Sequence, residues 1–135
     1  MSFQVVGLVH ANGRRGALNL VASLGDPKLT CTGFTPAPCV LTTGPQGETV
    51  RVVEFERPVP AGQPRDIEIQ AIIYRTSGSW VDISINNAEA PYSVADPTQH
   101  PAHTGEEPPL TIEQAKALVS DPTLDACATA CGPGS

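Results

Sequence analysis

The sequence predicts an α+β fold, a mainly antiparallel β-sheet of about five to six strands with one short C-terminal helix packed on it. The clearest sign is a pair of segments, 65–75 and 80–87, in which apolar and polar residues alternate on either side of a Ser-Gly turn. Strands with one apolar side belong to antiparallel sheets that pack on one face. A helix-capping pattern near residue 111 indicates the helix. At 135 residues, the chain 1–135 has the length of a single domain.

Residues 65–87 form the most regular predicted hairpin. Its apolar side chains fall on one face: Ile67, Ile69, Ala71, Ile73, Val81, Ile83 and Ile85. Asp82, Ser84 and Asn86 fall on the other face, which is expected to be solvated. A shift of the register by one residue would bury Asp82, so the pattern fixes the pairing. Tyr74 and Trp80 flank the turn, and we expect them either to pack across the hairpin or to form a small interaction patch.

Two further hairpins complete the predicted sheet, which covers residues 3–87. Residues 3–10 and 17–24 are predicted to pair, with Asn12-Gly13 inside a connection longer than two residues, so we expect a bulge or a wide turn there. Residues 39–43 and 48–56 are predicted to pair across a Gly-Pro-Gln-Gly turn, and Pro58 stops the second strand. A proline-rich connector, 88–109, follows the sheet.

The C-terminal segment 110–131 is predicted to be helical at its start. Thr111 is the expected N-cap, Gln114 its capping-box partner and Leu110 a hydrophobic staple. Asp121-Pro122 ends this helix. The residues expected to be buried are Ile112, Ala115, Leu118 and Val119.

The cysteines indicate disulfide bonding and an oxidising compartment. Four cysteines allow three pairings, and the short proline-containing loop between Cys31 and Cys39 favours a bond between these two. On a continuous helix, Cys127 and Cys131 would be poorly placed to bond each other, so either that tail is not helical or they pair elsewhere. The cysteine spacings differ from those of structural zinc sites.

The charge and hydropathy of the chain limit the cellular compartments and the classes of partner that we expect for it. The net charge of −6 disfavours nucleic acid as a partner. No apolar run approaches the ~20 residues that span a bilayer, and no signal peptide is present. Met1-Ser2 and Gly134-Ser135 resemble cloning remnants. We therefore expect an extracytoplasmic protein whose signal or membrane anchor lies outside this sequence.

The sequence contains none of the common enzyme motifs, so we expect a noncatalytic protein without a cofactor. The weak metal-ligand candidates are His100, His103, Glu106 and Glu107 in the connector, near Asp96. Pro101 separates the two histidines, and their spacing differs from the helical i, i+4 pair, which favours a hydrated acidic loop over a metal site. Carboxylates on the strands are expected on a solvated face, paired with neighbouring arginines; these acids are Glu54, Glu56, Asp66 and Glu68.

One combination of motifs is informative about origin. In order, these are Cys31 and Cys39, a glycine turn, a valine-rich strand, a hairpin ending in Asn86-Asn87, and Pro-Pro-Leu-Thr from Pro108 followed by Asp121-Pro122. This arrangement resembles actinobacterial (Streptomyces-like) secreted proteins and lipoproteins of unknown function over roughly residues 17–124. The resemblance implies an extracytoplasmic sheet with a cysteine pair, a proline connector and a helix. Cys127 and Cys131 depart from that pattern.

These observations favour a noncatalytic binding or sensor domain of a secreted or membrane-anchored envelope protein, which binds a protein or a small envelope ligand. The alternative is a structural or assembly-interaction protein of the cell envelope that uses a sheet edge or the connector. A metal-dependent enzyme centred on His100 and His103 is the least favoured hypothesis.

Overall fold

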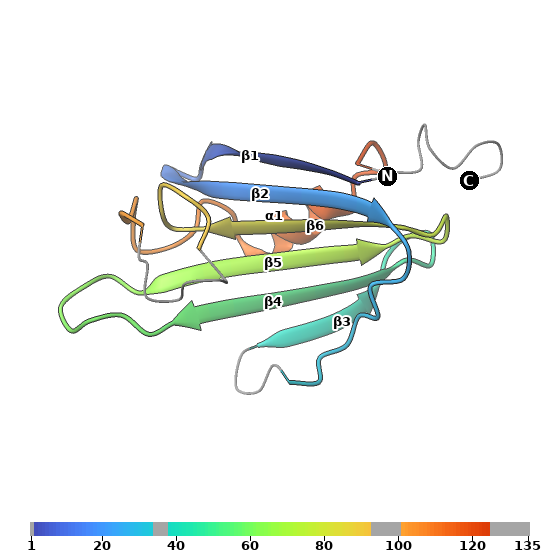
Figure 1. Ribbon diagram of the computed structural model, residues 1–135, viewed down its shortest axis with the longest axis horizontal. Coiled ribbons are helices and arrows are strands. Elements are labelled where there is room, and N and C mark those ends of the chain that lie inside the picture. The colour runs from blue at the N-terminus through green and yellow to red at the C-terminus, as the bar shows by residue number, and fades with distance from the viewer. Residues whose placement is uncertain (1, 34–37, 93–100, 125–135) are drawn as a thin grey trace.

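The computed structural model describes residues 2–33, 38–92 and 101–124, which form one six-stranded antiparallel sheet with a helix on one face (Figure 1). The elements are β1 (Ser2–Ala11), β2 (Arg14–Leu24), β3 (Cys39–Thr43), β4 (Thr49–Arg57), β5 (Asp66–Tyr74), β6 (Ser79–Asn86) and α1 (Ile112–Val119). The strand order is β1-β2-β6-β5-β4-β3. The predicted fold class is therefore confirmed.

The turn of the first hairpin differs from the prediction. Ala11 lies opposite Arg14, so the connection consists of Asn12 and Gly13 alone. Both have positive φ, 55° and 69°, as a two-residue type I′ turn requires. The expected wide loop was wrong because residues 14–16, which look like part of a turn, continue β2. The pairing of β1 with β2 consequently runs without a bulge from Ser2 to Ala11.

The core lies between the sheet and α1, which is behind the sheet in the view of Figure 1. The predicted apolar faces of β5 and β6 are buried there. α1 packs on β5 and β6 and also touches β4. Its capping box is present, with Thr111 accepting from the Gln114 backbone and the Gln114 side chain accepting from the Thr111 backbone. Ala115 and Val119 are buried as expected, but Ile112 is 37% exposed because it lies at the first turn, at the margin of the contact.

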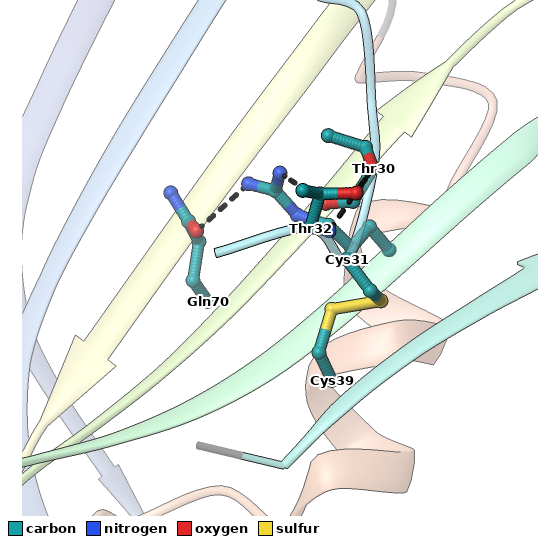
Figure 2. Close-up of a disulfide and its surroundings, with 6 residues drawn as sticks. Thr30, Cys31, Thr32, Cys39 and Gln70 are labelled. Atoms are coloured by element: carbon teal, nitrogen blue, oxygen red, sulfur yellow. Dashed lines mark hydrogen bonds between the residues drawn. A yellow bond between two sulfur atoms is a disulfide. The ribbon is translucent and has the colours of Figure 1, made fainter. Parts of the chain in front are cut away.

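The face of the sheet opposite α1, named here the outer face, carries the disulfide. Cys31 and Cys39 are bonded, which joins the segment after β2 to the first residue of β3 (Figure 2). Arg51 of β4 donates a hydrogen bond to the Thr30 carbonyl oxygen, so this segment is held against the outer face. Cys127 and Cys131 lie outside the described residues. Within the described residues, no helix is long and apolar enough to cross a membrane.

Candidate binding surface

A row of paired side chains runs along β5 and β6 on the outer face. We name it the β5–β6 strip, and its cross-strand pairs are Glu68 with Asn86, Gln70 with Ser84, Ile72 with Asp82, and Tyr74 with Trp80. The strip is central in the sheet, because β5 and β6 have neighbours on both sides. Its backbone is therefore held by hydrogen bonds from both sides, which fixes where its side chains project.

Gln70 organises the middle of the strip. Its amide nitrogen donates to Asp82 Oδ2 at 3.0 Å, and its amide oxygen accepts from Arg51 at 3.2 Å. The guanidinium of Arg51 also donates to the Thr30 carbonyl oxygen at 3.2 Å. The disulfide-bonded segment, β4 and the strip are therefore linked through one arginine and one glutamine.

The two carboxyl groups of the strip hold their protons more tightly than usual. Burial, and then the negative charge of Asp82, raise the pKa of Glu68 to about 7, while Arg57 acts in the opposite direction. Burial raises the pKa of Asp82 to about 6, although a hydrogen bond from Gln70 and the charge of Arg51 partly oppose it. Asp82 Oδ1 is shielded from solvent, and Ser84 is a further neighbour that lowers the pKa of this carboxyl. The strip therefore contains two acids that change charge near neutral pH.

Tyr74 and Trp80 lie directly opposite each other at one end of the strip. Both side chains are half-buried. An aromatic cross-strand pair stabilises a hairpin, and the exposed part of each ring stays accessible to a partner. The pair continues the same face as Asp82, because Trp80 and Asp82 are two residues apart on β6.

The expectation of a fully solvated outer face is wrong in the middle of the strip, where Ile72 is 6% exposed, and at the opposite end. Asn86 is 1% exposed and Asp66 is fully buried. The Asn86 side-chain oxygen accepts from the backbone nitrogens of Ala17 and Ala88, and its amide nitrogen donates to the Ala90 carbonyl oxygen. This burial arises at the end of the sheet, where Ala88, just after β6, forms a β-bridge with His103.

A second asparagine, Asn87, holds described residues on both sides of this bridge in place. Its side-chain oxygen accepts from the Ile67 backbone nitrogen at 3.0 Å and from the Tyr92 hydroxyl at 2.5 Å. Its amide nitrogen donates to the carbonyl oxygens of Arg65 and Gly105. Buried amides that satisfy this many backbone groups are structural, so these asparagines shape the end of the strip rather than bind a ligand.

The metal-ligand candidates are distributed between different environments. His103 Nε2 lies 2.6 Å from Asp66 Oδ1, and Arg57 Nε lies 3.8 Å from Asp66 Oδ2. Glu107 pairs with Arg14 at 3.0 Å, and Glu106 is exposed beside it in an open depression at the turn of the first hairpin. His100 and Asp96 lie outside the described residues. Among the residues that the structure describes, no three His, Cys, Asp or Glu side chains form a group that could hold a metal ion.

The raised pKa values predict how stability depends on pH. The ordinary pKa of Glu68 is 4.5 and rises to about 7 in the folded protein, and that of Asp82 is 3.8 and rises to about 6. At a pH between the ordinary and the raised value, the folded state keeps a proton that the unfolded chain has released. The free energy of unfolding should therefore fall as the pH rises from about 4 to about 7. Replacing Glu68 with glutamine should make this slope shallower, as measured by urea denaturation across the range. An unchanged slope in Glu68→Gln would contradict the raised pKa.

Comparison with protein-family models, curated proteins and solved structures finds no match to this chain. The alternating pattern of the sequence predicted strands at Tyr74, Trp80, Glu68 and Asp82, but these residues were not predicted to form one site. The available signal was the shared face: Glu68 and Tyr74 on β5, and Trp80 and Asp82 on β6, have the same parity in a regular hairpin.

Proposed function

We propose that this protein is a noncatalytic, extracytoplasmic binding domain that takes a basic segment of a partner polypeptide on its outer face. In this proposal a lysine or arginine side chain of the partner lies against Glu68 and Asp82. The observation that carries it is a pair of acids on one face of the sheet whose pKa values stay raised although Arg57 and Arg51 offset part of their negative charge. A cation is the ligand that such a pair favours.

The charges around the strip support a cationic ligand. The two nearby guanidinium groups have other partners besides Glu68 and Asp82. Arg51 bonds Thr30 and Gln70, and Arg57 pairs with Asp66 and lies 4.9 Å over the Tyr92 ring. A ligand ammonium or guanidinium group would relieve the repulsion between Glu68 and Asp82. The net charge of −6 attracts basic partners over a longer range.

The aromatic end of the strip suits the remainder of such a side chain. A lysine or arginine has a long apolar stem in addition to its charge. Trp80 offers a ring face for that stem, and a cation near a tryptophan ring gains a further attraction. A basic peptide that crosses the strip would thus meet carboxyl groups and an aromatic surface on the same face.

The extracytoplasmic location is supported by the Cys31–Cys39 bond, because disulfides persist mainly in oxidising compartments. The resemblance to actinobacterial secreted proteins and lipoproteins points the same way. In this proposal any attachment to a membrane comes from an anchor outside the sequence, and nucleic acid is not a partner.

The affinity for a blocked lysine pentapeptide tests the proposal, with its glutamine counterpart as the reference probe. We expect the lysine peptide to bind and its affinity to rise from about pH 6 to about pH 8, because Glu68 loses its proton over this range. Measured by calorimetry, binding at pH 7 should release protons into the buffer. The double variant Glu68→Gln/Asp82→Asn should bind at least about tenfold more weakly, as expected when both members of a charge pair are lost.

The matched control is Glu89→Gln/Glu113→Gln. It removes the same number of carboxyl groups, from exposed positions outside the strip, and should leave the affinity nearly unchanged. Equal losses in the two double variants would mean that the peptide follows net charge alone, and the proposed site would be wrong.

A second candidate function is structural or assembly interaction in the cell envelope. The observation that favours it is the edge of the sheet at β1, which exposes large apolar side chains. An edge strand of this kind serves association between chains rather than capture of a charged ligand.

A further inference from the structure

The strand β1 forms one edge of the sheet and lacks the usual protection of an edge. It is ten residues long and contains no charged residue and no proline. Its pairing with β2 has no bulge. Four of its large apolar side chains are between 42% and 55% exposed: Phe3, Val5, Val6 and Leu8. Native proteins normally interrupt such edges with lysine, proline or a bulge, because an open edge recruits another strand.

The turn geometry shows which backbone groups of β1 face outward. A two-residue turn makes Ala11 and Arg14 a hydrogen-bonded pair, and such pairs recur at every second residue. The odd-numbered residues of β1 therefore bond to β2. The N–H and C=O groups of Gln4, Val6, Leu8 and His10 point away from β2, and among the described residues no strand lies on that side.

The sequence of β1 is nearly symmetric about Gly7. Moving outward from this glycine, Val6 matches Leu8, Val5 matches Val9, and the polar Gln4 matches the polar His10. A strand that pairs with its own copy in antiparallel orientation about Gly7 brings these matched residues opposite each other. Apolar side chains then meet apolar ones on both faces, and the outward backbone groups of the two copies fall into register.

We propose that two copies of this protein form a symmetric dimer by antiparallel pairing of their β1 strands, with Gly7 on the two-fold axis. In this register Val6 bonds through its backbone to Leu8 of the second copy, and Val5 lies beside Val9 of the second copy. A two-fold interface uses the same surface on both chains, which is what a self-complementary strand provides. The two sheets become one continuous sheet, and both β5–β6 strips lie on its outer face.

The opposite edge of the sheet is a poorer candidate. The strand β3 has only five residues, and the disulfide ties its first residue to the preceding segment. It nevertheless exposes Val40 to 58%, close to the 55% of Val6 on β1. The two valines therefore provide a matched pair of positions on the two edges.

Sedimentation across a range of concentrations tests the dimer on the full chain. We expect a species of twice the 14.1 kDa mass at high concentration. Val6→Lys should weaken the association by at least about tenfold, because a charge on an edge strand opposes pairing. Val40→Lys adds the same charge to the other edge and should leave the association unchanged. Both positions are exposed, so neither variant should lose its fold, which circular dichroism would check.

A cross-link tests the register. A side chain added at Gly7 meets no atom within 4 Å, so Gly7→Cys fits the monomer. In the proposed dimer the two introduced cysteines form a non-hydrogen-bonded cross-strand pair, whose Cα atoms lie about 4.5 Å apart. This Cα–Cα distance is within the range for a disulfide. Mild oxidation should give a covalent dimer, with the linkage located by peptide mapping. Val5→Cys should not form one, because Val5 lies opposite Val9.

A mass of twice the monomer that falls with Val6→Lys alone, together with the Gly7→Cys cross-link, supports the proposal. A monomer at every concentration would overturn it, as would a dimer that is unaffected by Val6→Lys or a cross-link that forms through Val5→Cys instead of Gly7→Cys. These results do not depend on whether the strip binds a basic peptide.

Discussion

Replacing Arg75 with methionine should lower the free energy of unfolding by about 3–5 kcal/mol, the cost of removing one member of a buried ion pair. Arg75 is 6% exposed and Glu48 is 3% exposed. Their charged groups lie 3.7 Å apart. Arg75 also donates to the carbonyl oxygens of Val119, at the end of α1, and Asp121. The variant would leave Glu48 buried without its cation and the end of the helix without its donor.

Urea denaturation followed by tryptophan fluorescence measures this loss. The comparison variants are Glu48→Gln and the double variant Glu48→Gln/Arg75→Met. Because the glutamine carries no charge, the double variant should be less destabilised than the sum of the two single variants. A loss below about 1 kcal/mol in Arg75→Met would mean that the pair does not hold the helix to the sheet.

Replacing Gly16 with alanine should cost at least about 3 kcal/mol, the upper end for adding a group to a filled interior. A Cβ at this position would lie 1.9 Å from the Asn86 backbone oxygen and 2.6 Å from Cδ of Pro109. Neither the backbone of β6 nor a proline ring can turn aside as a flexible side chain would. The clash would therefore separate β2, the end of β6 and the segment that leads into α1.

The matched control is Gly7→Ala in the adjacent strand, where an added Cβ meets no atom within 4 Å. Measured on the monomer, this change should alter stability by no more than about 0.5 kcal/mol. Similar losses in the two alanine variants would contradict the close packing at Gly16. The comparison uses denaturant midpoints at low protein concentration, so that association does not contribute.

The sequence predicted the elements that depend on local patterns. The alternation in residues 65–87 located β5 and β6, and Thr111 with Gln114 located the start of α1. Strand order did not follow from the sequence, because β6 lies between β5 and β2 and such a position depends on contacts between distant segments. The first turn was mispredicted because Arg14 and Arg15 are polar residues that continue the strand.

The candidate site was only partly predictable for a related reason. Alternation placed Asp82 on the outer face correctly, but it gave no information about burial there. Asp66 and Asn86 are buried because residues 101–107 lie against the sheet, where Thr104 donates to the Arg15 carbonyl oxygen and Glu107 pairs with Arg14. Burial of Glu68 and Asp82 raises their pKa values, so the property that suggests a cation site appears only in the folded chain.

The central claim is that the β5–β6 strip binds a basic side chain, and mapping of backbone amide chemical shifts by NMR tests it most directly. The lysine pentapeptide would be titrated into labelled protein at pH 7, with the glutamine peptide as the reference. We predict that the shifts concentrate on Glu68, Gln70, Trp80 and Asp82. Shifts that concentrate instead at the turn of the first hairpin, or that spread evenly over the acidic surface, would contradict the proposed function.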